Sequence, residues 1–293
     1  MKKNTQKLEL ICILLAFCTF LFSFQNTKAV AVESNLHDAI KLNKVSQKST
    51  SNGNYSGNSV SLQLKNLTNK EMRVKIPQGT LFAPENEGEQ TLITVVDQFV
   101  SLPPKGKSTQ VIDAYCSESH DHCPTKASNF TIDNTKNSKF KELFTYMSGK
   151  KIPSSVYQNM VWTLSDNNSV SSIPNNEAVT KDLRKFLCKI TNQVDEWYNS
   201  SQTRTVGKKG EIVTETTDVG GNISFSCPAN TVIHQEVHKQ TGGLVFKDEK
   251  RRTTAAGINE MPFSLRVKGW AKGTYILKVK TDKAVLEEYL FVV

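Results

Sequence analysis

An eight-residue stretch in the middle of the chain combines two thiols, two imidazoles and two carboxylates. Cys116 and Cys123 bracket it, and His120 and His122 lie between them. Sulfur and imidazole nitrogen are ligands that Zn²⁺ and Cu²⁺ favour, so these four residues form a candidate metal site, with zinc as the implied cofactor. An oxidising compartment favours a local disulfide loop through the same cysteines instead. The residues alone leave both interpretations open.

A second group of possible ligands follows a strand pattern further along the chain. His234, Glu236 and His238 alternate with Ile233 and Val237, so the two imidazoles and the carboxylate share one face of the expected strand. Such a face could hold a metal. A solvated strand face is the simpler interpretation, because the order of these residues is not that of a metalloprotease helix.

Established catalytic motifs are missing from the sequence. The chain contains no G-x-S-x-G, no H-E-x-x-H, no G-x-G-x-x-G and no phosphate-binding glycine loop. We therefore interpret the protein as non-catalytic.

The first 31 residues predict the compartment. Lys2, Lys3 and Lys7 precede an apolar run over 8–24, and Ala29-Val30-Ala31 is an A-x-A cleavage signal. We expect a signal peptide over 1–31 and a secreted or cell-surface location. No later stretch reaches the ~18 continuous apolar residues of a spanning helix, so we expect no transmembrane segment in the mature chain.

Four of the six cysteines lie beyond the signal peptide, and an even number in an exported chain predicts disulfides. Sequence alone does not choose among the three possible pairings. The candidates are Cys116, Cys123, Cys188 and Cys227.

The charge of the chain argues against nucleic acid as a partner. The whole sequence carries 37 Lys and Arg against 28 Asp and Glu, and removal of residues 1–31 leaves 33 against 27. The basic residues are dispersed and do not alternate with aromatic residues, which excludes the usual nucleic-acid pattern. Weak attraction to acidic glycans or lipid headgroups fits this surplus.

Periodicity predicts a mainly β fold with a small helical part. A polar segment covers 32–59, and short strands with turn signals over 60–133 indicate an antiparallel sandwich. Over 134–201 apolar residues recur at helical spacing, with the longest stripe from Leu183 to Trp197 and Asn175 or Asn176 as its cap. A polar, basic linker is expected at 202–210, followed by an immunoglobulin-like sandwich at 211–293.

The last part of the chain resembles the C-terminal immunoglobulin-like modules of bacterial secreted proteins, including type IX secretion sorting domains. The strongest match is the alternating run Gly273, Tyr275, Leu277 and Val279. The resemblance implies an antiparallel sandwich with Tyr275, Leu277 and Val279 pointing inward, and a role in sorting or as a structural module.

Two short motifs resemble surface thioester adhesin domains. Tyr115-Cys116 is followed downstream by Gln158-Asn159-Met160-Val161-Trp162. The resemblance implies a thioester between Cys116 and Gln158 that captures host amines.

Together these observations predict a secreted or surface-associated binding or adhesion protein. Its partner would be an extracellular protein or a glycan. The alternatives are a covalent adhesin that uses Cys116 and Gln158, and a metal-binding exported protein.

Overall fold

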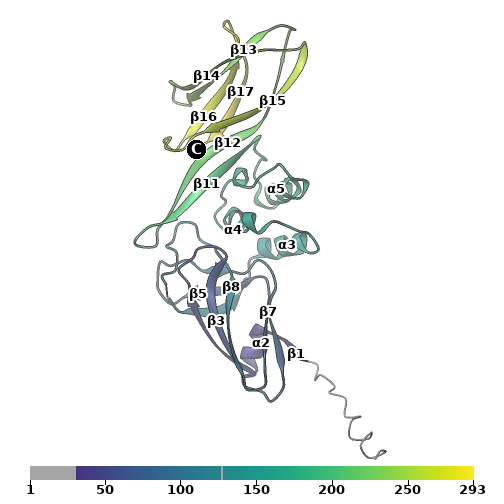
Figure 1. The fold of residues 1–293 in the computed structure, drawn as a ribbon, viewed down its shortest axis with the longest axis vertical. Coiled ribbons are helices and arrows are strands. Elements are labelled where there is room, and N and C mark those ends of the chain that lie inside the picture. The colour runs from purple at the N-terminus through teal and green to yellow at the C-terminus, as the bar shows by residue number, and fades with distance from the viewer. Residues whose placement is uncertain (1–30, 127) are drawn as a thin grey trace, which may run out of the picture.

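The computed structural model describes residues 31–126 and 128–293 (Figure 1). An N-terminal β part, a group of helices and a C-terminal β part follow one another along the long axis. The predicted signal peptide lies outside the described residues except for Ala31. The mainly β architecture with a small helical component confirms the predicted fold class. No helix in the described ranges is long and apolar enough to cross a membrane.

Three small sheets and a short helix build the N-terminal part. Nearly all strand pairs are antiparallel; β1 and β4 are the parallel pair. The sheet orders are β1-β4-β7, β2-β3-β8 and β10-β5-β6-β9. The elements are β1 (Val32–Asn35), α2 (Leu36–Lys41), β2 (Val45–Ser51), β3 (Asn58–Asn66), β4 (Met72–Ile76), β5 (Thr80–Pro84), β6 (Leu92–Ile93), β7 (Gln98–Leu102), β8 (Lys107–Asp113), β9 (Tyr115–Cys116) and β10 (Phe130–Asn134).

Alternation in the sequence accounts for the central strand of this part. In β3, Val60, Leu62 and Leu64 are fully buried, and the polar residues between them are more exposed. The polar segment 32–59 also belongs to the folded part, because it supplies β1, α2 and β2. Strand β2 lies at the edge of its sheet, where one side of the strand needs no partner.

The helical part lies between the two β parts (Figure 1). Its longest helix, α5, ends at Thr191 because Asn192 adopts a left-handed conformation, with φ of 60°. The expected helical stripe therefore stops before Trp197. Glu177, and neither Asn175 nor Asn176, occupies the N-cap position of the helix, and its side chain makes no capping hydrogen bond. The elements are α3 (Ser138–Met147), η1 (Ser154–Val156), α4 (Tyr157–Ser165), η2 (Val170–Ser172) and α5 (Ala178–Thr191).

Two facing sheets form the C-terminal sandwich. Their orders are β11-β12-β15 and β14-β13-β16-β17, and Tyr275, Leu277 and Val279 point into the shared core as predicted. The apolar residues near the end of the chain belong to the last strand of this sandwich, β17. The elements are β11 (Tyr198–Val206), β12 (Ile212–Cys227), β13 (Val232–Lys239), β14 (Leu244–Thr253), β15 (Gly257–Arg266), β16 (Thr274–Lys280) and β17 (Val285–Val292).

The predicted linker at 202–210 is wrong. Residues 202–206 continue β11 and pair with β12, which leaves a short turn at 207–210. The polar composition reflects an edge strand, whose exposed face tolerates charge. The turn also docks on the N-terminal part, because the backbone N–H of Cys123 donates to the carbonyl oxygen of Gly210 at 2.7 Å. A side chain at Gly210 would meet the Cys123 carbonyl oxygen at 2.9 Å.

Helix α4 contributes to two hydrophobic cores. Trp162 belongs to the N-terminal core, whereas Met160 and Val161 belong to the helical core. The helix thus fixes these two parts of the molecule against each other.

Replacement of a buried leucine of α5 tests the helical core. Leu187 is fully buried, so Leu187→Ala should reduce the free energy of unfolding by roughly 2–5 kcal/mol in urea denaturation. The Lys185 side chain is 72% exposed, so Lys185→Ala should cost about 0.5 kcal/mol or less. Equal losses for the two variants would contradict the packing described for α5.

Candidate functional site

The structure brings Gln158 and Cys116 into contact. Helix α4 packs against β9, and the Gln158 Nε2 donates a hydrogen bond to the backbone oxygen of Cys116 at 2.8 Å. Both residues are buried, at 4% and 0% exposure. The Gln158 Oε1 is buried and has no hydrogen-bond partner among the described residues. The Gln158 carboxamide therefore lies beside Cys116 with its oxygen unpaired.

The described residues contain no disulfide: Cys116, Cys123, Cys188 and Cys227 are all free thiols, so the predicted bridges are not formed in this structure. Cys188 and Cys227 lie in the helical and C-terminal cores, which are separate from the core that contains Cys116. The Cys116 and Cys123 thiols lie within hydrogen-bonding reach of each other. Burial is the main cause that raises the pKa of the Cys116 thiol well above its usual value, and the contact with the Cys123 thiol adds to it.

The loop from Cys116 to Cys123 does not assemble the predicted metal site. Among residues 31–126 and 128–293, no three His, Cys, Asp or Glu side chains are placed to hold a metal ion. The Glu118 carboxylate accepts hydrogen bonds from the backbone N–H of Thr91 and from the Ser117 hydroxyl. Both of its oxygens therefore already have partners within the protein. The His120 side chain instead lines a cleft described below.

The second predicted ligand group forms a buried polar cluster, not a solvated strand face. Glu236 is only 9% exposed, and its two oxygens contact His234 at 3.2 Å and His238 at 3.0 Å. Lys280 donates to the same carboxylate at 2.9 Å. The hydrogen bond from Lys280 is the largest cause that lowers the pKa of Glu236, which falls to about 2. This carboxylate links β13 to β16.

A polar cleft lies where the three parts of the molecule meet, and we call it the junction cleft. Its volume is about 380 Å³. It draws on the loop after β9, helix α4, the β11–β12 hairpin and the turn before β16. Its walls include Ser119, His120, Asn159, Trp162, Arg204 and Lys272, and no Asp or Glu lines it.

Arg204 is the central cation of the junction cleft. Its guanidinium lies 4.8 Å from the centre of the Trp162 ring, a cation–π contact. Its Nη2 donates to Asn159 Oδ1 at 2.6 Å and to Gln202 Oε1 at 2.7 Å. Burial is the largest cause that lowers the pKa of Arg204. The Nε of Arg204 and the Nε1 of Trp162 are buried donors without an acceptor in the described residues.

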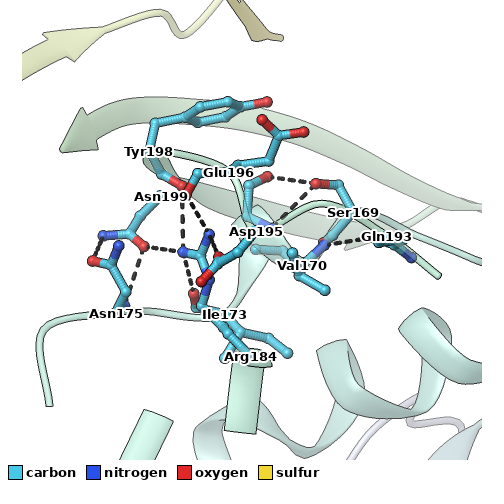
Figure 2. Close-up of polar contacts among 12 residues, drawn as sticks. Ser169, Val170, Ile173, Asn175, Arg184, Gln193, Asp195, Glu196, Tyr198 and Asn199 are labelled. Carbon is cyan, nitrogen blue, oxygen red and sulfur yellow. Dashed lines mark hydrogen bonds and ion pairs between the residues drawn. The ribbon is translucent and has the colours of Figure 1, made fainter. Parts of the chain in front are cut away.

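A second arginine, Arg184, holds the N-terminal end of β11 in place (Figure 2). Arg184 of α5 is fully buried and pairs with Asp195 at 2.6 Å. Its guanidinium also donates to the backbone oxygen of Glu196 at 2.8 Å and to Asn199 Oδ1 at 2.7 Å. These contacts fix the segment that leads from α5 into β11.

Sequence reasoning missed both arginines. Arg184 follows Leu183 and precedes Leu187 by three positions. Helical spacing therefore places it on the buried stripe and predicts its burial. Arg204 lies in the segment interpreted as a linker. Its contact with Trp162 joins residues 42 positions apart, which no local pattern reveals.

No family model, no curated protein and no solved structure matches this chain.

The buried cluster around Glu236 predicts a dependence of stability on acid. A carboxylate whose pKa is lowered on folding stabilises the folded state. For Glu236 this stabilisation is complete at pH values above 4.5, its ordinary pKa, and is lost as the pH falls towards its folded-state pKa of about 2. Glu236→Gln should lower the free energy of unfolding at pH 6 and flatten its fall between pH 4.5 and 2, measured by denaturation at each pH. Glu287→Gln, at an exposed position, serves as control. Identical pH profiles for wild type and Glu236→Gln would refute the prediction.

Proposed function

We propose that this chain is a secreted or surface-associated, non-catalytic binding protein whose ligand is an acidic glycan held in the junction cleft. The observation that carries the proposal is Arg204, which is half-buried and has no carboxylate partner within the described residues. A cation that is partly withdrawn from water without an anion beside it loses solvation, and a ligand carboxylate or sulfate would supply the missing charge.

The chemistry of the remaining walls supports an anionic ligand. Lys272 adds a second positive charge, and the lining contains no carboxylate that would repel an anion. The planar guanidinium suits two-point recognition of carboxylate or sulfate oxygens.

Replacement of Arg204 tests this proposal. Arg204→Gln should weaken binding of uronic-acid or sulfated oligosaccharides about ten-fold or more in calorimetry, because a charge-assisted hydrogen bond contributes roughly 1.5–3 kcal/mol. Lys139→Gln removes the same charge from an exposed position of α3 and should leave the affinity unchanged. Equal weakening by both variants would reduce the effect to net charge and contradict a specific site.

The Cys116–Gln158 contact favours a second candidate function, covalent capture through a thioester. In this step the Cys116 sulfur attacks the Gln158 Cδ, the C–N bond breaks, and ammonia leaves with the thiol proton. A primary amine of the target then attacks the same carbon, which forms an amide and releases the thiol. The support is the 2.8 Å contact between the two residues and the unpaired Gln158 Oε1.

Intact mass decides this candidate. A thioester makes the mature protein about 17 Da lighter than its sequence predicts, which is the mass of one ammonia. Methylamine treatment should then increase the mass and leave the methylamine attached at Gln158. Both the formation and the opening of the thioester involve the Cys116 sulfur. Cys116→Ala should show the full sequence mass and no reaction with methylamine. A wild-type protein at full mass, unreactive towards methylamine, would exclude the thioester.

A further inference from the structure

A second cleft lies beside the base of β11 and shares no residue with the junction cleft. Its volume is about 410 Å³. Four of its residues are asparagines that come from three separate segments, and we call it the amide cleft. The lining consists of Asn175, Asn176, Lys181, Trp197, Asn199, Gly221 and Asn222.

The lining indicates the type of ligand. Each carboxamide offers two N–H donors and an oxygen acceptor, so the cleft presents both kinds of group in nearly equal measure. A hydroxyl group also donates and accepts, and a carboxylate or phosphate only accepts. Lys181 is the single formal charge in the lining, which gives little attraction for an anion. The walls therefore suit a ligand rich in hydroxyl groups better than a charged one.

Two of the four amides are already held in place, as Figure 2 shows for Asn175 and Asn199. The Asn199 Oδ1 accepts from buried Arg184 at 2.7 Å and from the backbone N–H of Asn175 at 3.1 Å. The Asn199 Nδ2 donates to the Asn175 Oδ1 at 2.8 Å. Amides that are fixed before a ligand arrives lose less conformational freedom when they bind it.

The other two amides are available to a ligand. Asn176 and Asn222 are exposed, and neither side chain has a hydrogen bond within the described part of the chain. They come from the loop before α5 and from β12, so a ligand that contacts both would bridge the helical part and the C-terminal sandwich.

Trp197 supplies the apolar surface of the amide cleft. The indole is half-buried and its Nε1 donates to the Leu290 backbone oxygen at 2.6 Å, which holds the ring in one orientation. Gly221 lies directly against it, since a Cβ there would be 2.6 Å from the Trp197 oxygen and 3.1 Å from the ring atom Cε3. Amphipathic aromatic rings with amides around them suit sugars, whose rings have apolar C–H faces and polar edges.

We propose that the amide cleft binds a neutral glycan, a chain of sugars without carboxylate or sulfate groups. This site is independent of the acidic-glycan site in the junction cleft. The two sites differ in charge, in lining and in the residues of β11 on which they depend.

The test uses the mature chain and a panel of neutral hexasaccharides: the glucose, mannose and N-acetylglucosamine oligomers in their common linkages. At least one should bind in calorimetry or in ligand-observed NMR. The double variant Asn176→Ala/Asn222→Ala should weaken that binding about ten-fold, because it removes two neutral hydrogen-bonding groups. Both side chains are exposed, so the variant should keep the unfolding midpoint of the wild type. The matched control is Asn69→Ala/Asn134→Ala, at exposed positions outside both clefts.

The outcomes separate this proposal from the proposed function. Neutral binding that survives Arg204→Gln and is lost in Asn176→Ala/Asn222→Ala supports the amide cleft, whatever the acidic oligosaccharides do. Neutral binding that Arg204→Gln abolishes would move the ligand to the junction cleft and overturn the proposal. Absence of binding across the neutral panel at millimolar concentration would overturn it as well.

Discussion

The buried guanidinium of Arg184 is the constraint on which the arrangement of this molecule depends. A charge removed from water must be paired and hydrogen-bonded, and removal of one partner of such a pair costs about 3–5 kcal/mol. Asp195 supplies the opposite charge, and oxygens of Ile173, Glu196, Tyr198 and Asn199 accept the remaining hydrogen bonds (Figure 2). Because most of these oxygens belong to the segment that enters β11, satisfying Arg184 fixes where the C-terminal sandwich begins.

The placement of β11 then determines both clefts. Successive side chains of a strand point to opposite faces, so residues two positions apart share a face. Ser200, Gln202 and Arg204 share one face of β11. The Ser200 hydroxyl lies 3.1 Å from the Ser171 hydroxyl of η2, and Gln202 and Arg204 line the junction cleft. Asn199 has the opposite parity and lines the amide cleft. One strand therefore places polar groups in two separate clefts, which share no residue.

Local sequence patterns predict which helices and strands this fold contains better than they predict where each one ends. Alternation over Val60, Leu62 and Leu64 predicts a strand because the burial of one face is a local property of the chain. The end of α5 is different, since apolar residues continue at helical spacing to Trp197 although Asn192 turns the chain. Trp197 then packs on the C-terminal sandwich, with its ring 5.1 Å from that of Tyr289. The apolar spacing predicts that Trp197 packs against a core, and only the fold shows which core this is.

Sites assembled from distant segments depend on contacts that no spacing records, and Cys116 with Gln158 is the instructive exception. A resemblance to a known motif paired them, and the fold places them in contact across 42 positions. Burial raises the pKa of the Cys116 thiol, which disfavours the thiolate that attacks a carboxamide. A finished thioester carries no charge, so the same burial imposes no such penalty on it and keeps water away from the bond. The environment of Cys116 would therefore slow the formation of the proposed thioester and would protect the bond once formed.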